Sequence, residues 1–395
     1  MKKLLSGLAG LAGIALALMG VVSAKAQDSV KIGIINEYSG QFADTGAQID
    51  NGIKLYMKQH GDTVAGKKIE LIRKDTGGIA PDLAKRLAQE AIVRDGADIL
   101  AGFSLTPNAL AVADVSAEAK KFMVVMNAAT AIITTKSPYI ARTSSTTPQL
   151  NYTLGTWAAK SGIKKVYTMV SDYGPGIDAE TWFQTGFKEG GGQIVGSVRF
   201  PVASPDFSAY IQAAKDSNPD AIYIWIPGGT QPAAVGAALA ERGIDVSKTK
   251  VLGQDALASE TALKSMGDVA VGIISVADYD YTHDSALNHE FVKAFNDEFH
   301  RSPDFFAVGG YDGTHLIYEA LKKTGGKADG DSLIEAAKGM AWESPRGPIS
   351  IDPDTRDIIQ TVYIRRVVKA GGGLQNLEFD SFPNVKDPAK ARMPH

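Results

Sequence analysis

Short apolar runs rich in β-branched residues alternate along the chain with longer helical stretches. The apolar runs lie at 31–35, 69–74, 98–101 and 122–126, and the helical stretches between them include 47–60 and 81–95. Apolar, β-branched runs of this length are typical of buried strands. Because strands and helices alternate, the pattern predicts an α/β fold in which a parallel sheet is covered by helices on both faces.

The same order of strand, short polar loop and helix recurs in the second half of the chain. The matching segments are 31–40 with 165–174, 97–111 with 219–235, and 122–130 with 250–258. Since these weak matches occur in the same order, we predict two similar, doubly wound α/β lobes. Ligands of such sheets bind beyond the carboxyl ends of the strands, so the loops of both lobes are expected to line one cleft.

Prolines at helix starts and the segments after residue 281 add to the predicted arrangement of the two lobes. Four prolines open helical patterns, namely Pro81, Pro107, Pro148 and Pro232. Thr106 and Thr147 precede two of them and are predicted as N-caps. The helix after Thr106 has an apolar stripe that faces its sheet, so its amino end is expected to point toward the cleft. Further predicted elements are helices at 288–300 and 311–323, a turn-rich stretch at 347–356 and a β-rich run at 360–368. Crossovers between the lobes near 142–147, 277–281 and 346–356 would accommodate them.

The amino-terminal residues predict export. Lys2 and Lys3 precede an apolar run at 4–22, and an A-x-A pattern ends at Ala26. This arrangement is typical of a secretory signal cleaved after Ala26, and an uncleaved anchor is the alternative. The chain has no cysteine, which excludes a thiol nucleophile, a cysteine metal site and attachment of lipid through an amino-terminal cysteine. We therefore expect a periplasmic protein.

Charge and motifs exclude several other functions. The net charge of −3 does not favour nucleic acid or an anionic membrane surface as a partner. His289-Glu290 begins a zinc motif, but Lys293 stands where its second histidine belongs. The chain contains no phosphate-binding loop of the G-x-x-x-x-G-K-[ST] type, and 102–106 lacks the second glycine of a nucleophile elbow. We expect no catalytic residues, no metal and no cofactor.

The predicted cleft loops carry hydrogen-bond donors and aromatic rings instead. The donors are Ser104, Thr106, Asn127, Thr130 and Thr230, and the rings are Phe42, Phe103, Tyr173, Trp225 and Tyr279. Short side chains beside the donors leave backbone N–H groups accessible, and helix amino ends attract anions. The pattern indicates a site for a carboxylate that is attached to an apolar body.

An ordered set of short motifs resembles one transport family. The motifs are Lys31-Ile-Gly-Ile-Ile with Ser39-Gly40 and Gly46, Asn127-Ala-Ala-Thr130, Arg142-Thr143, Asp172-Tyr-Gly174, Asp206-Phe-Ser208 and Gly347-Pro348. Over nearly all of the mature chain, the sequence resembles the substrate-binding proteins of ABC importers of the branched-chain amino acid class. The resemblance implies a type I periplasmic binding protein, with two α/β lobes joined by three crossovers that close on a ligand. It also implies an ABC permease in the inner membrane as partner, and we expect a monomer.

The resemblance implies roles for individual residues. Thr106, the backbone of Ala128 and Thr130 would bind the ligand carboxylate. Asp255 stands where amino-acid binders hold the ligand ammonium. Tyr173 and Tyr279 would close from the second lobe. Thr45 and Thr230 replace tyrosines of the amino-acid binders, so a roomier pocket is expected. The full set of expected ligand-binding residues is Phe42, Thr45, Phe103, Ser104, Thr106, Asn127, Ala128, Thr130, Tyr173, Thr230, Asp255 and Tyr279.

The expected ligand is an aromatic or otherwise bulky carboxylate. The runs 102–109 and 127–133 look like those of family members that bind benzoate-type or hydroxycinnamate-type acids. Asp255 favours the alternative, a branched-chain amino acid. An exported two-domain α/β enzyme is the rival from another class, and it requires an acid–base pair in the cleft. We predict a first lobe at 27–144 plus 281–347, and a second lobe at 145–280 plus 348–395.

Overall fold

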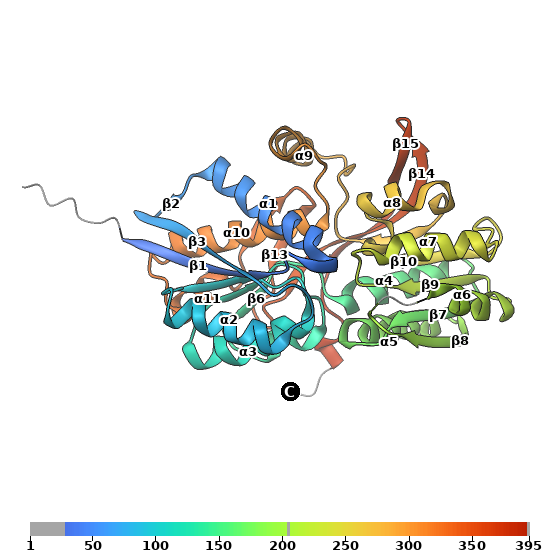
Figure 1. Ribbon diagram of the computed structural model, residues 1–395, viewed down its shortest axis with the longest axis horizontal. Coiled ribbons are helices and arrows are strands. Elements are labelled where there is room, and N and C mark those ends of the chain that lie inside the picture. The colour runs from blue at the N-terminus through green and yellow to red at the C-terminus, as the bar shows by residue number, and fades with distance from the viewer. Residues whose placement is uncertain (1–27, 204–205, 393–395) are drawn as a thin grey trace, which may run out of the picture.

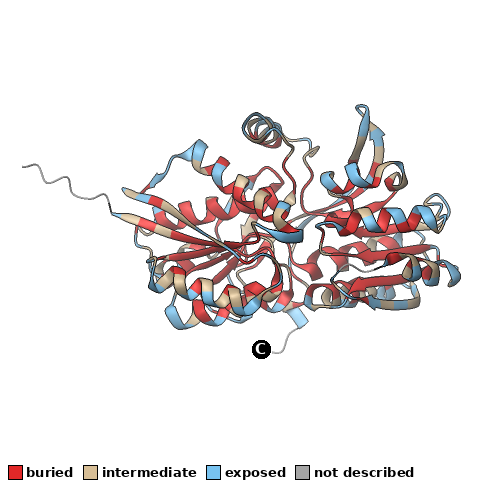
Figure 2. Cartoon of the chain, viewed as in Figure 1, coloured by how far each residue is buried: buried red, intermediate tan, exposed pale blue. Residues whose placement is uncertain are grey.

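The computed structural model describes residues 28–203 and 206–392, in which two α/β lobes lie side by side (Figure 1). The predicted signal sequence lies outside these residues. Buried residues fill both sheets and the inner faces of the helices, while exposed residues lie on the outer helix faces (Figure 2). Within the described ranges, no helix combines the length and apolarity needed to cross a membrane.

The first lobe is built on a six-stranded sheet. Its strand order is β2 (Thr63–Val64), β3 (Lys67–Asp75), β1 (Ser29–Asn36), β4 (Ile99–Gly102), β5 (Met123–Val125) and β6 (Ile140–Arg142). Only the β2–β3 pair is antiparallel. Apolar side chains of α1 (Ala43–His60), α10 (Phe305–Lys323) and α11 (Gly330–Ala337) cover one face. The other face packs against α2 (Pro81–Val93) and α3 (Thr106–Ala119).

The second lobe is built on a larger sheet. Its order is β12 (Ala341–Ser344), β13 (Gly347–Ile351), β14 (Ile358–Ala370), β11 (Ile274–Ala277), β10 (Lys250–Gln254), β9 (Ala221–Trp225), β7 (Lys165–Ser171) and β8 (Gln193–Phe200), and β15 (Gly373–Val385) pairs with β14. One face packs against α4 (Thr147–Lys160) and α5 (Gly174–Glu189). The other packs against α6 (Phe207–Asp216), α7 (Gln231–Glu241) and α8 (Glu260–Met266). α9 (Ala286–Phe299) packs against α1.

This arrangement confirms the predicted fold class: both sheets have a parallel core, with helices on both faces. The predicted N-caps, however, were wrong by one residue. α3 includes Thr106 and is preceded by Leu105, and α4 is capped by Thr146, whose hydroxyl accepts a hydrogen bond from the Gln149 N–H at 3.1 Å. Proline fits either of the first two helical positions, because neither N–H has an intrahelical partner, so it does not fix the cap.

The chain passes from the first lobe to the second after β6 and returns after β11 to α9 and α10, and β12 and β13 then join the second sheet through the pairing of β13 with β14. The buried guanidinium of Arg346, in the turn between β12 and β13, donates to the carboxylate of Asp278 after β11 and to the carbonyl oxygen of Thr143 after β6. Met340 and Ile351 pack into the first core although β13 pairs with β14 of the second sheet. The exact lobe boundaries therefore stay a prediction.

Candidate functional site

A cavity lies between the lobes, where the loops after β4, β5, β7, β9 and β10 converge. These are carboxyl ends of parallel strands, as the doubly wound topology requires. The predicted site residues that line it are Phe42, Thr45, Ser104, Thr106, Asn127, Tyr173 and Asp255. Phe103, Ala128, Thr130, Thr230 and Tyr279 are outside this lining.

The loop after β4 presents two hydroxyl groups to the cavity. Gly102 and Phe103 have positive φ angles, 102° and 62°, and this left-handed turn is followed by the cavity-lining run from Ser104 to Thr106. Phe103 itself is fully buried in the core under α2 and α3. The Ser104 hydroxyl is buried and has no hydrogen-bond partner in the described structure. Ser104 and Thr106 therefore offer donors to a ligand, whereas Phe103 shapes the loop.

The Asn127–Thr130 loop supports these donors. The resemblance implied that the Ala128 backbone binds the ligand carboxylate. In the structure, the Ala128 N–H donates to the carbonyl oxygen of Phe103 at 2.9 Å and is therefore not free for a ligand. The neighbouring Ala129 lines the cavity instead. The Thr130 hydroxyl donates to that of Thr106 at 3.0 Å, which leaves the Thr106 proton available to the cavity. Asn127 donates to the Ser104 carbonyl at 2.7 Å and ties the two loops together.

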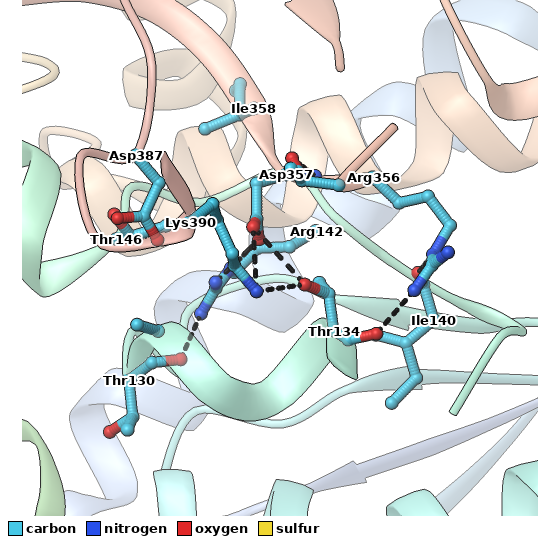
Figure 3. Close-up of polar contacts among 12 residues, drawn as sticks. Thr130, Thr134, Ile140, Arg142, Thr146, Arg356, Asp357, Ile358, Asp387 and Lys390 are labelled. Carbon is cyan, nitrogen blue, oxygen red and sulfur yellow. Dashed lines mark hydrogen bonds and ion pairs between the residues drawn. The ribbon is translucent and has the colours of Figure 1, made fainter. Parts of the chain in front are cut away.

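Arg142 holds this loop from behind (Figure 3). Its Nη1 donates to the carbonyl oxygens of Ala128 at 3.0 Å and Thr130 at 2.9 Å, and its Nε donates to Asp357 at 2.9 Å. Lys390, from the carboxyl-terminal segment, pairs with the same Asp357 at 3.3 Å. The sequence marked Arg142 only as part of a motif and assigned it no role. Because its guanidinium group is buried and its nitrogens are hydrogen-bonded to the loop carbonyls and to Asp357, Arg142 is a positioning residue for the loop.

The opposite end of the cavity is a buried network in the second lobe. The Gln254 side-chain oxygen accepts hydrogen bonds from Trp225 Nε1 and from Asn151 Nδ2, each at 2.8 Å. Its Nε2 donates to Asp255 Oδ1 at 3.2 Å. The Tyr223 hydroxyl donates to Asn151 and extends the network. Trp225 and Asp255 are thus held in fixed positions by one chain of hydrogen bonds.

Aromatic side chains line the cavity between these two ends. The rings of Tyr173 and Trp225 lie 5.8 Å apart at an angle of 51°. Phe42 contributes from the first lobe, and Phe305 and Phe306 join it at the start of α10. The sequence missed the last two because it placed that helix only at 311–323, and no local pattern links them to the earlier loops.

Thr230 and Tyr279 lie elsewhere. Thr230 is exposed at the start of α7 and lines an adjoining hollow that shares Thr45 and Ala256 with the cavity. Tyr279 is buried under α9, where its hydroxyl donates to Asn288 at 3.0 Å. Thr230 thus lines the adjoining hollow and not the cavity, whereas Tyr279 serves the packing of α9.

A hydrogen bond joins the two lobes beside the cavity. The Ala131 N–H, directly after the Asn127–Thr130 loop, donates to Asp178 Oδ2 of α5 at 3.0 Å. A Cβ atom on Gly229 of the second lobe would lie only 3.3 Å from the ring of Phe42 in the first lobe. The lobes are therefore in contact around the cavity, and opening them would break the Ala131–Asp178 bond.

Replacing Asp178 with alanine should weaken ligand binding up to about tenfold, because a charge-assisted hydrogen bond of about 1.5–3 kcal/mol would be lost from the closed form, and its partial exposure reduces this value. Isothermal titration would measure the affinity, and small-angle X-ray scattering would show a larger open fraction. Asp172→Ala, at an exposed acid of the same lobe, is the control. Equal affinity of Asp178→Ala and the wild type would contradict a role for this bond in closure.

The cavity lacks the groups that an enzyme of this architecture would need. Its described lining includes no histidine, and Asp172 is exposed. The hydrogen bonds of Asp255 within the described protein come from Gln254 and from the Ala256 N–H, and neither is an acid, a base or a nucleophile. No group of three or more histidine, cysteine or acidic residues able to hold a metal ion occurs in 28–203 or 206–392.

Comparison with known proteins agrees with this geometry. A family model described as periplasmic binding protein matches residues 29–372. A Leu/Ile/Val-binding protein homolog from Brucella melitensis is 41% identical over 384 residues, which cover 95% of this chain and 98% of the relative.

Two solved structures are also similar. The solute-binding protein of an ABC transporter from Rhodopseudomonas palustris BisB5, in complex with 3,4-dihydroxybenzoic acid, is 55% identical with a TM-score of 0.89, covering 92% of this chain and 99% of that one. Another from Rhodopseudomonas palustris HaA2, in complex with p-hydroxybenzoic acid, is 40% identical with a TM-score of 0.90, covering 93% and 100%.

Proposed function

Because the chain belongs to the periplasmic binding protein family, we propose that it is the solute-binding component of an ABC importer and carries an aromatic carboxylate. As a member of this family it is a binding protein and not an enzyme. The finer questions are which ligand it binds, which residues hold that ligand and with which partners it works.

The observation that carries the aromatic ligand is the division of the cavity lining. The hydroxyls of Ser104 and Thr106 line it from the first lobe, and the rings of Tyr173 and Trp225 line it from the second lobe. Each hydrogen bond to a carboxylate contributes about 1.5–3 kcal/mol, so several such bonds can hold the acid group without an arginine. A flat ring between aromatic walls would supply the apolar contact. Together these terms are sufficient for micromolar binding, about −8 kcal/mol.

Two findings from the comparisons bear on this choice in different directions. The solved relative at 55% identity holds 3,4-dihydroxybenzoic acid, which supports an aromatic acid as the ligand of this chain. The curated relative at 41% identity is named for leucine, isoleucine and valine, so a branched-chain amino acid remains the second candidate. Asp255 favours that candidate only if it is ionised and faces an ammonium group.

The proposed function implies a permease as partner and the periplasm as location. Ligand binding would shift the lobes toward the closed form, which a permease in the inner membrane would recognise. We infer that residues 1–26 direct export to the periplasm and are removed after Ala26, and that the mature protein acts as a monomer. No nucleic acid or cofactor takes part in this function.

A ligand screen on protein purified from the periplasm tests the proposal, and its intact mass reports whether cleavage occurs at Ala26. Benzoate and 4-hydroxybenzoate represent the aromatic acids, and leucine, isoleucine and valine the amino acids. We expect an aromatic acid to stabilise the protein by about 2.7 kcal/mol at a concentration 100 times its Kd. Stabilisation by leucine without any response to an aromatic acid would show that the ligand is a branched-chain amino acid and not an aromatic acid.

A further inference from the structure

Asp255 carries one unused oxygen at the cavity. It begins a short helix, Asp255–Ala258, directly after β10 and is 1% exposed. Its Oδ1 accepts hydrogen bonds from the Ala256 N–H at 2.7 Å and from Gln254 Nε2 at 3.2 Å. Its Oδ2 is buried and has no partner among the described residues. A buried oxygen with unmet hydrogen-bonding capacity at a binding cavity points to a ligand group.

Among the described residues, the arginines that pair with Asp278 and Asp280 form no ion pair with Asp255. Arg365 is committed to Asp280, at 2.8 Å, and to the Tyr279 carbonyl. Arg346 is committed to Asp278 and Asp312. Burial, and secondly the charge of Asp278, raise the pKa of Asp255 well above its ordinary value, against a smaller opposing effect of Arg365. Burial therefore favours the protonated form of Asp255 more than it does for an exposed aspartate.

The same network that orients Asp255 also orients one aromatic wall. Gln254 receives the Trp225 indole N–H and donates to Asp255, so the ring face and the free oxygen are held by a single side chain. A flat ligand beside Trp225 is therefore expected to direct a substituent toward Asp255. The hydroxyls of Ser104 and Thr106, on the other lobe, would hold its carboxylate.

We propose that Asp255 Oδ2 forms a hydrogen bond with a hydroxyl group on the ligand ring, so that the protein selects hydroxylated aromatic carboxylates over unsubstituted ones. This inference rests on the proposed function and adds the ligand subclass to it. A hydroxyl group suits Asp255 in either protonation state, because it can donate to a carboxylate or exchange hydrogen bonds with a carboxylic acid. An ammonium group gains its full attraction only from the ionised form.

Affinities for matched ligands test the inference. Isothermal titration of the mature wild type should give at least about tenfold tighter binding of 4-hydroxybenzoate, 3-hydroxybenzoate or 3,4-dihydroxybenzoate than of benzoate. Asp255→Ala should bring this ratio close to one, because the hydroxylated acids lose the bond that benzoate never makes. Asp255→Asn, whose amide oxygen still accepts from a hydroxyl, should keep most of the preference. Asp172→Asn removes an exposed acid near the cleft and should change neither affinity.

The outcomes separate this inference from the proposed function. A wild-type unfolding transition of Asp255→Ala shows that the variant is folded. Equal affinity of the wild type for benzoate and all three hydroxylated acids would overturn the role of Asp255 and leave the aromatic ligand class standing. If Asp255→Ala lost benzoate binding with an unchanged unfolding transition, Asp255 would be needed to bind the unsubstituted ring. This result would overturn the proposal that Asp255 selects ligands by their hydroxyl group. Binding of leucine alone would overturn both proposals.

Discussion

Replacing Arg142 with methionine is expected to lower the free energy of unfolding by about 3–5 kcal/mol and to abolish detectable ligand binding. The guanidinium is completely buried and its partners cannot turn to water. Without it, Lys390 is the ion-pair partner left to Asp357 among residues 28–203 and 206–392, and the Ala128 and Thr130 carbonyls lose their donor. Urea denaturation and isothermal titration would measure the two effects.

Two further variants distinguish the effect of Arg142 on ligand binding through the Asn127–Thr130 loop from its effect on the stability of the whole protein. Arg142→Lys keeps a positive charge near Asp357 but lacks the planar fork that reaches both carbonyls, so affinity should fall more than stability. Arg392→Met removes a half-exposed arginine that pairs with Glu189 at 3.2 Å, and it should change neither quantity appreciably. Wild-type affinity in Arg142→Lys would show that the loop does not depend on the fork.

Replacing Arg346 with methionine is expected to cost a similar 3–5 kcal/mol and to loosen the connection between the lobes. Arg346 is 1% exposed and bonds to Asp278, to Asp312 at 2.9 Å and to the Thr143 carbonyl, so it joins the passages after β6 and after β11 to the turn between β12 and β13. Removing it leaves two buried carboxylates without their cation. Urea denaturation would measure the loss, and small-angle scattering the distribution of lobe orientations.

The charge argument predicts a partial rescue. Arg346→Met combined with Asp278→Asn and Asp312→Asn should be more stable than Arg346→Met alone, because no uncompensated carboxylate remains. Lys369→Met is the control, since its ion pair with Asp268 has side chains 61% and 77% exposed and contributes little. A triple variant as unstable as the single one would mean that packing, and not charge, sets the effect.

Local sequence patterns predicted the parallel strands of both lobes and most helices that cover them. The predicted run at 31–35 lies within β1, and the helix predicted at 81–95 corresponds to α2. These elements can be predicted because the spacing of apolar residues and the positions of turn residues are local properties, which depend on neighbours within a few positions. Boundaries were less accurate: α10 begins at Phe305 rather than near 311, so two rings of the cavity were missed.

By itself the sequence determined the order of the elements, the internal repeat and the hydroxyl-bearing loops that face the cleft. Only the tertiary structure decided which groups of those loops are free. Ala128 has its N–H bonded to Phe103, whereas the Ser104 hydroxyl has no partner within the part of the chain that the structure describes. The roles of Arg142 and Arg346 likewise depend on Asp357, Asp278 and Asp312. The reason is physical: a motif specifies donors and acceptors locally, but partners from distant segments determine which of them remain for a ligand.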